Sequence, residues 1–233
     1  MPVISRHTAF AVAATLSIIP AHAALAQNSG FYLSGKGGPS FLNVSGIHST
    51  TGAGTVNDDS DSNLVGAFGM AGGYTWLQQG LPLRTELEFM NRTEVTTDST
   101  PLFTSGATNF ALASTVQDVS LMLKAYWYVP MGDGAKWSPY FTFGGGIARN
   151  AVKGDLTPIA TGGAPTHFSK SRLDPAWTIG AGISFYLGNN VVNDVEIHYV
   201  DLGSADWGIP GAANISANAL RGAEIIFALR YNF

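Results

Sequence analysis

The chain has 233 residues, of which 45% are hydrophobic and only 12% are charged, and its net charge is −4. A soluble domain carries about 25% charged residues, so this composition is unusual for one. After the N-terminal segment there is no apolar stretch of about 18 residues, which excludes a helical membrane protein of the usual kind. The absence of cysteine excludes disulfides and cysteine-based metal sites, and no basic cluster supports nucleic-acid binding. The length suits one domain.

Residues 1–26 have the pattern of a secretory signal peptide. Arg6 precedes an apolar run over residues 9–19, which is too short for a membrane anchor and is followed by small residues. We therefore predict export, cleavage after Ala26 and a mature domain over residues 27–233.

From Phe31 onward the hydrophobic pattern has a period of two, which predicts an all-β domain. The predicted strands are 31–41, 64–76, 82–92, 117–129, 139–149, 175–187, 191–202 and 220–233. Several exceed the roughly five or six residues usual in soluble sheets and suit a tilted membrane-spanning strand of about 9–11 residues. The sequence predicts an eight-stranded antiparallel up-and-down transmembrane β-barrel.

Short and long connections alternate along the chain. The predicted short turns are 77–81, 130–138 and 188–190, and the predicted long, polar loops are 42–63, 93–116, 150–174 and 203–219. Outer-membrane barrels have tight periplasmic turns at one rim and long extracellular loops at the other. The alternation is therefore an independent argument for such a barrel.

Aromatic residues gather at the strand ends next to the short turns and the termini. Aromatics favour strands in any setting, but a girdle of them at the membrane interface is typical of outer-membrane barrels. The predicted periplasmic girdle comprises Phe31, Tyr74, Trp76, Trp127, Tyr140, Phe185, Tyr231 and Phe233, and Phe41, Phe89, Trp177 and Tyr199 approach the opposite rim.

The two faces of the predicted strands differ in side-chain size. One face carries bulky apolar residues such as Leu87, Leu123 and Phe143, and the other carries Gly, Ser and Thr with scattered charges. Eight strands enclose an interior just wide enough for side chains. We therefore expect the small face inside and the bulky face against lipid.

Eight charged residues fall on the predicted inner face. A closed interior disfavours unpaired charge, and these residues balance as cations and anions. They are Lys36, Arg84, Lys124 and Arg230 against Glu86, Glu88, Glu196 and Glu224. They would form either a channel lining or a plug of salt bridges, and the narrow lumen favours the plug.

The chain ends on Phe233, and Phe227, Leu229 and Tyr231 precede it at alternate positions. This pattern resembles the terminal β-signal by which the outer-membrane assembly machinery recognises its substrates. We expect these four residues to serve as an assembly signal.

Several short blocks resemble a known family. They are Phe31-Tyr32-Leu33-Ser34-Gly35-Lys36-Gly37-Gly38, residues 83–89, Pro139-Tyr140 followed by Gly144-Gly145-Gly146, residues 199–203 and the terminal Arg-Tyr-x-Phe. Together they resemble the small OmpA-like outer-membrane β-barrels, especially the surface-antigen type of alphaproteobacteria. The resemblance implies surface-exposed loops and no catalytic residues. The chain lacks the peptidoglycan-binding domain of full-length OmpA, so no cell-wall tether is expected.

Histidines allow other interpretations. His167 and Ser169 set a base beside a hydroxyl, as in lipid A-modifying barrels, but they lie in a segment dense in Gly, Pro and Thr. His198 shares a strand face with Glu196, and a histidine satisfied by interior neighbours is the favoured interpretation. Together with His48, these histidines are too few and too separated to indicate a metal site.

The predicted loops carry opposite charges. Aspartates make loop 42–63 acidic, whereas the third long loop and its border are basic. The cations there are Arg149, Lys153, Lys170 and Arg172. They would contact lipopolysaccharide phosphates or a host partner, or would simply be solvated.

We predict a monomeric, non-enzymatic outer-membrane barrel, without cofactor or metal, that supports envelope integrity and presents loops for adhesion or as an antigen. Its expected partners are outer-membrane lipids, lipopolysaccharide, the barrel-assembly machinery and a host or surface ligand. The alternatives are a small pore for passive transport and a lipid A-modifying enzyme.

Overall fold

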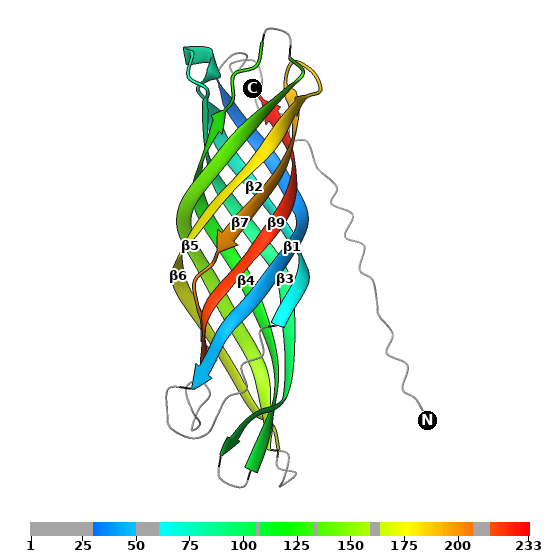
Figure 1. Ribbon diagram of the computed structural model, residues 1–233, viewed down its shortest axis with the longest axis vertical. Helices are drawn as coiled ribbons and strands as arrows, with labels where there is room; N and C mark the ends of the chain where they lie inside the picture. The colour runs from blue at the N-terminus through cyan, green and yellow to red at the C-terminus, as the bar shows by residue number, and fades with distance from the viewer. Residues whose placement is uncertain (1–29, 50–60, 106–107, 133–134, 159–163, 207–214) are drawn as a thin grey trace, which may run out of the picture.

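The computed structural model describes residues 30–49, 61–105, 108–132, 135–158, 164–206 and 215–233, so the predicted signal peptide lies outside the described residues. Eight long strands wind into an elongated barrel (Figure 1). They are β1 (Phe31–Ser49), β2 (Asp61–Thr75), β3 (Leu83–Ser105), β4 (Thr108–Tyr128), β5 (Trp137–Pro158), β6 (Thr166–Tyr186), β7 (Val191–Asp201) and β9 (Ile215–Asn232). The two-residue strand β8 (Ala205–Asp206) pairs with β9 beyond the end of β7.

The barrel closes because β1 pairs with both the second and the last strand. Ser34 of β1 lies opposite Ala71 of β2 on one side and opposite Arg230 of β9 on the other. Each long strand runs antiparallel to its neighbours, and closure leaves the barrel wall without a free edge. The predicted fold class is confirmed. None of the described residues forms a helix long and apolar enough to cross a membrane.

The short turns and the C-terminus lie at one end of the barrel, which we call the short-turn end, and the other end is the long-loop end (Figure 1). The turn between β2 and β3 contains a 3-10 helix, Leu77–Gln79, which the sequence did not predict. It ends on Gly80 in the left-handed conformation, with φ of +77°, where glycine is favoured.

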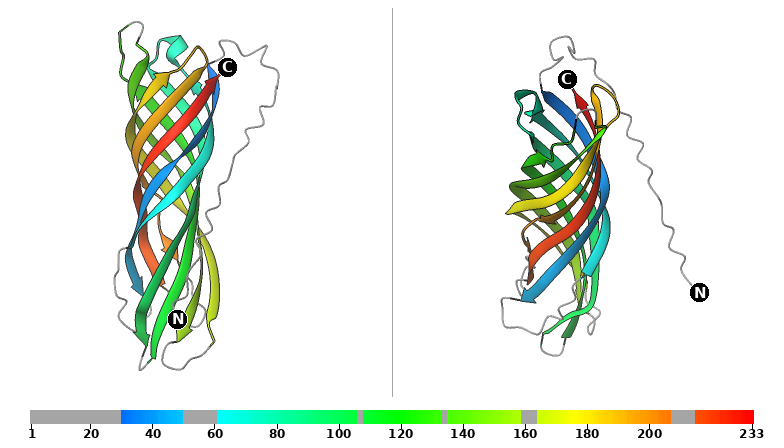
Figure 2. Two further views of the ribbon diagram at one scale, coloured as in Figure 1. Left: turned by 90° about the vertical axis from the view of Figure 1, so that its right-hand side faces the viewer. Right: turned by 45° about the horizontal axis from the view of Figure 1, so that its top comes forward.

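Seven of the eight long strands run further toward the long-loop end than predicted, and β3, β4, β5 and β6 extend the furthest. The predicted loop 93–116 is mostly strand, because β3 and β4 stay paired as far as Ser105 and Thr108. The predicted loop 150–174 is likewise mostly strand, with Leu156 of β5 opposite Thr166 of β6. The alternation of apolar and polar residues fades in these segments although the pairing continues. Figure 2 shows the green strands reaching past the rest of the barrel.

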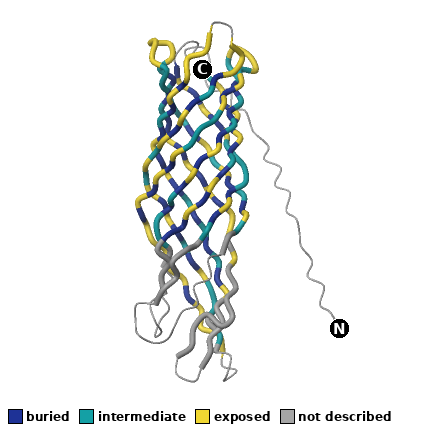
Figure 3. The backbone as a smooth tube through the Cα atoms, viewed as in Figure 1, coloured by how far each residue is buried: buried dark blue, intermediate teal, exposed yellow. Residues whose placement is uncertain are grey.

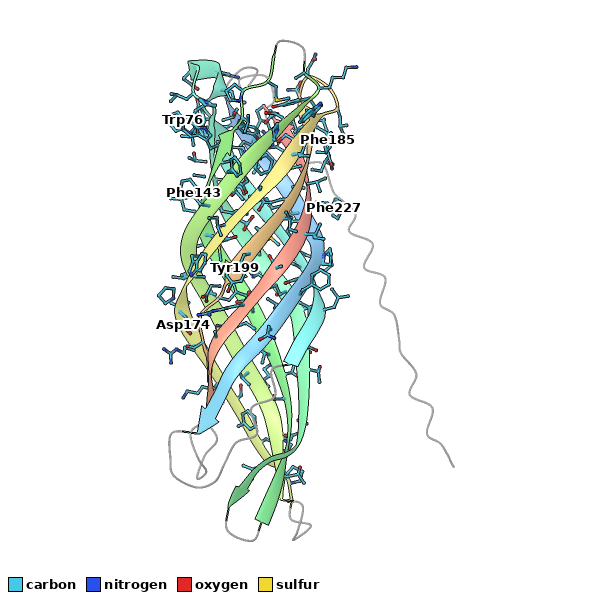
Figure 4. All side chains as sticks on the ribbon, viewed as in Figure 1. Trp76, Phe143, Asp174, Phe185, Tyr199 and Phe227 are labelled. Carbon is cyan, nitrogen blue, oxygen red and sulfur yellow. The ribbon has the colours of Figure 1, made fainter. Side chains whose placement is uncertain are left out.

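Buried and exposed residues alternate along each strand (Figure 3). In β7, Glu196 and His198 are buried, whereas Ile197 and Tyr199 between and beside them are exposed. Most of the large apolar side chains point outward, as Leu123 (64% exposed) and Phe143 (59%) illustrate. A soluble protein has its large apolar side chains inside, so the opposite arrangement seen here suits a barrel wall that faces lipid. Figure 4 shows Phe143 and Phe227 projecting from the outer face.

Candidate functional site

All eight predicted interior charges lie inside the barrel. None of their side chains is more than 6% exposed to solvent. Strand alternation puts them on the same inward face as the small residues, which leave room for long charged side chains. We call these eight side chains and the charged groups that contact them the interior network.

The centre of the interior network joins four strands. Lys36 of β1 contacts Glu86 of β3 through its Nζ atom and lies 2.5 Å from Glu88. Lys124 of β4 lies 2.7 Å from Glu196 of β7 and 3.3 Å from Glu88. Each ammonium group therefore bridges two carboxylates. The pairs of Lys36 with Glu86 and Glu88, and of Lys124 with Glu196, join strands that are not neighbours, whereas Lys124 and Glu88 lie on the adjacent strands β4 and β3.

Toward the short-turn end the interior network is anchored on Asp194, a residue that the sequence analysis missed. Arg84 Nη1 lies 2.9 Å and Arg230 Nε 3.3 Å from the same carboxylate oxygen. The Arg84 guanidinium also stacks 3.7 Å from the ring centroid of Tyr126, a cation–π contact. The hydroxyl of Tyr126 donates to Glu86, so this layer is joined to the central cluster.

Tyr140 was wrongly predicted to belong to the aromatic girdle. Its side chain points into the lumen and is 1% exposed, because it shares the inward face of β5 with Thr142. Its ring packs edge-on against Tyr126 and Tyr128, with centroids 5.4 and 5.6 Å apart. Gly182 of β6 makes the space, since a Cβ there would come within 2.5 Å of the Tyr140 ring.

Toward the long-loop end the interior network centres on Arg92, which was also missed. Its Nε lies 2.7 Å from Glu224 and its Nη1 lies 2.5 Å from Asp118. His198 joins this layer to the central cluster, with Nε2 2.8 Å from Glu224 and Nδ1 2.7 Å from Glu196. The ion pairs and the histidine therefore form one connected chain along the barrel axis.

The sequence did contain the signal for the missed charges. Arg92, Asp118 and Asp194 all lie within predicted strands and at inward positions of the period of two. With them, the interior network holds five Lys or Arg side chains, six carboxylates and one histidine.

A strap lies inside the barrel toward the long-loop end. It consists of Leu202, Gly203 and Ser204, which directly follow β7. Asn150 of β5 donates to the carbonyls of Leu202 (2.8 Å) and Ser204 (2.9 Å), although β6 separates β5 from β7. Asp174 of β6, labelled in Figure 4, accepts from the hydroxyl of Ser204 (3.1 Å). Backbone hydrogen bonds also join Leu202 (2.9 Å) and Gly203 (2.6 Å) to Leu220 of β9, so the strap is held by three strands.

The outer rim at the short-turn end carries the remaining predicted aromatics. Phe31, Trp127 and Phe185 are exposed there, and Figure 4 places Trp76 and Phe185 near this end. The Tyr74 ring packs edge-on against Phe31 and Trp76, with centroids 4.9 and 4.8 Å away. Their role as a membrane girdle stays a prediction.

The predicted assembly signal lies on β9 and at the chain end. Phe227, Leu229 and Tyr231 project outward and are exposed. The amide of Phe233 donates to the carbonyl of Phe31 at 3.0 Å, which ties the last residue to the first residue of β1. Recognition of this segment by an assembly machinery stays a prediction.

The outer face of β3, β4, β5 and β6 beyond the bulky residues holds a hollow of about 430 Å³. Its lining includes Lys153, Asp155, His167 and Ser169. His167 Nδ1 contacts Asp155, but no hydrogen bond joins His167 to Ser169, both of which the structure describes. Across the described ranges, no three His, Asp or Glu side chains are grouped to hold a metal ion.

The chain resembles known outer-membrane proteins along most of its length. It is 26% identical over 204 residues to the outer membrane protein PagN of Salmonella typhimurium, and the match covers 83% of each chain. A major outer membrane protein of Thermus thermophilus superimposes with a TM-score of 0.49 at 14% identity, over 86% of this chain and 99% of that one. OprG of Pseudomonas aeruginosa gives a TM-score of 0.46 at 15% identity, over 88% and 97%.

The family is given by a match over nearly the whole chain. Residues 10–233 match the family described as "Outer membrane protein beta-barrel domain". The closed barrel with its bulky outer face agrees with that match. The chain therefore belongs to the outer membrane protein beta-barrel domain family and is a protein of the outer membrane.

Proposed function

We propose that the protein is a sealed, non-enzymatic barrel that supports the integrity of the outer membrane and presents its long-loop end for attachment to other surfaces. The observation that carries this proposal is the interior network, which fills the lumen from one layer of ion pairs to the next. A barrel filled in this way strengthens the wall without opening a path through it. We place the long-loop end outside the cell, because outer-membrane barrels have their short turns in the periplasm.

Two features support a sealed lumen over a small pore. The ion pairs of Lys36, Lys124 and Arg92 each connect strands across the barrel, so side chains occupy its axis. The strap then lies against β5, β6 and β9 inside the barrel, and Leu202 within it is fully buried. An ion would have to displace paired charges, and breaking a buried pair costs about 3–5 kcal/mol.

The extended strands support a role at the cell surface. The hairpins β3–β4 and β5–β6 stay paired well beyond the bulky outer band. Their outward residues there are polar and exposed, as Thr96, Lys153 and Ser169 show. A paired sheet holds such side chains in fixed positions outside the membrane, which a binding surface requires.

The contact between His167 and Asp155 keeps a lipid A-modifying enzyme as the second candidate. It supplies a histidine oriented by a carboxylate, with the hydroxyl of Ser169 two residues along the same strand. The missing hydrogen bond between His167 and Ser169 and the high exposure of His167 favour the non-enzymatic proposal. A lipid A mass spectrum that changes on expression of the chain, but not of Ser169→Ala, would favour the enzyme.

Shortening the extracellular hairpins tests the proposal. Residues 97–114 and 154–168 are each replaced by an Asn-Gly turn, which joins the register pairs Thr96–Thr115 and Lys153–Ser169. We expect the shortened barrel to reach the outer membrane and to exclude a membrane-impermeant dye as well as the intact chain does. Attachment of the bacteria to epithelial cells should fall to that of cells lacking the chain. Unchanged attachment would contradict the proposed surface role.

A further inference from the structure

We propose that the outer face of β5 and β6, just beyond the bulky band at the long-loop end, binds the phosphate groups of an outer-leaflet lipid. The inference rests on the proposed orientation of the barrel and adds a lipid site to it. Two exposed cations, Arg149 and Lys153, lie four residues apart on this outward face of β5.

Arg149 and Lys153 differ in ion pairing from two other exposed cations at this end of the barrel, Arg221 and Arg172. Arg221 is paired with Asp201 at 2.9 Å, and Arg172 with Asp174 at 2.8 Å. Within the part of the chain that the structure describes, neither Arg149 nor Lys153 has an ion-pair or hydrogen-bond partner. Two cations without an internal partner on one face leave a positive surface for an external anion.

The position of Arg149 matches the boundary between hydrocarbon and headgroups. Ile147 precedes it on the outward face of β5 and is exposed, as the lipid-facing residues are. Its cross-strand neighbours are apolar, Val119 on β4 and Leu173 on β6, and no carboxylate lies opposite it. The aliphatic stem of an arginine there covers apolar surface while the guanidinium reaches the polar layer.

Lys153 lines the hollow of about 430 Å³ on this outer face. The hydroxyls of Thr96, Thr115 and Ser169 line the same hollow and supply further hydrogen-bond donors. Asp155 is the carboxylate of this hollow, and it is engaged by His167. An ammonium group surrounded by hydroxyls is suited to phosphate oxygens, which accept hydrogen bonds only.

The shape of the site favours a lipid over a small soluble anion. Arg149 and Lys153 are separated by about 13 Å along the strand, further than one phosphate reaches, so the ligand has to carry separated phosphates. Toward the middle of the barrel, Gly145 leaves a gap on the outward face between Phe143 and Ile147, where a Cβ would meet no atom closer than 3.9 Å. An acyl chain fills such a gap while its headgroup lies over the cations.

The test compares lipids that differ only in phosphate. The purified, folded chain in neutral detergent is titrated with bisphosphorylated lipid A or with fully dephosphorylated lipid A, and the bound fraction is measured by native mass spectrometry. We expect the wild-type chain to prefer the phosphorylated lipid. Arg149→Gln and Lys153→Gln should each weaken its binding about fivefold, and the double variant about 25-fold, with little change for the dephosphorylated lipid.

Two matched controls remove the same charge elsewhere. Arg221→Gln alters a paired arginine at the same rim, and Lys136→Gln alters an exposed lysine at the short-turn end; both should bind like the wild type. Heat-modifiable gel migration verifies that every variant is folded. Equal binding of the two lipids, equal loss in the controls, or tight competition by inorganic pyrophosphate would overturn the inference. The two claims fail separately. Attachment that is unaffected by shortening the hairpins contradicts the surface role, whereas equal binding of the two lipids contradicts only the lipid site.

Discussion

The guanidinium of Arg92 and the carboxylate of Glu224 form a two-contact ion pair across the lumen, with Nε–Oε1 at 2.7 Å and Nη2–Oε2 at 3.1 Å. Their strands, β3 and β9, are not neighbours, since β1 and β2 lie between them in the barrel wall. The forked geometry is the strong form of this pairing. The interior network therefore braces the wall across the barrel.

Removing one partner of this pair should strongly destabilise the barrel. Glu224→Leu leaves Arg92 buried without its main counter-ion, and we expect the free energy of unfolding in lipid vesicles to fall by about 3–5 kcal/mol. Urea unfolding followed by tryptophan fluorescence measures it. Arg221→Gln, which breaks the exposed pair with Asp201, should cost less than about 1 kcal/mol.

Replacing both partners should restore much of this loss. In Arg92→Met combined with Glu224→Leu, no charge of the pair stays buried alone, although Asp118 loses its cation. We expect the double variant to be more stable than Glu224→Leu by at least about 1 kcal/mol. A double variant that is less stable than the single one would show that the pair does not act as a unit.

His198 should carry protons on both ring nitrogens. Each nitrogen lies within hydrogen-bond distance of a carboxylate, Glu196 or Glu224, and only a protonated imidazole donates from both. The charge would balance the sixth carboxylate of the interior network against its five Lys and Arg side chains. Nitrogen-15 NMR of the ring in bilayers at neutral pH should show two N–H groups. A ring with one bare nitrogen would contradict this assignment.

Gly203 should be more sensitive to substitution than a glycine of similar backbone conformation. Gly203 and Gly80 have φ of +81° and +77°, so alanine strains the backbone at both by about 1–2 kcal/mol. At Gly203 the added Cβ would also lie 2.4 Å from the Asp174 Cβ, whereas it meets nothing at Gly80. Gly203→Ala should therefore lower the urea midpoint further than Gly80→Ala. Equal urea midpoints for the two variants would show that the strap accommodates the added methyl group without loss of stability.

The terminal aromatic residue should matter for assembly. Deleting Phe233 removes the end of the predicted signal and the hydrogen bond to Phe31, so we expect less heat-modifiable barrel in outer-membrane fractions. Phe233→Trp keeps a terminal aromatic residue and should assemble normally. Normal levels of the truncated chain would count against the assembly signal.

The sequence was sufficient to predict the barrel, because its defining patterns are local. Bulky residues such as Leu123 and Phe143 alternate with small or charged ones, and that alternation assigns each face directly. Tyr140 shows the limit of a pattern based on residue type. Its position along the strand suited a girdle. However, it lies two residues from the inward-facing Thr142, so it points to the same inner face.

Strand ends and interior pairings could not be predicted in the same way. Beyond the lipid-facing band the outer face loses its bulky apolar residues, and Val116, Val152 and Phe168 are buried inside instead. The segments that end at Ser105 and Pro158 therefore resemble loops although they stay paired. The partners of Arg92 depend on the stagger between β3 and β9, which only the closed barrel fixes. The sequence therefore indicated which charges lie inside and not which of them meet.

Single-channel recording in planar bilayers tests the sealed barrel most directly. The purified full chain, inserted and verified as folded, should give no ion conductance above that of the protein-free membrane, because the interior network and the strap occupy the lumen. Stable conductance steps that change when Lys124 or Glu86 is neutralised would contradict the account and make the lumen a pore.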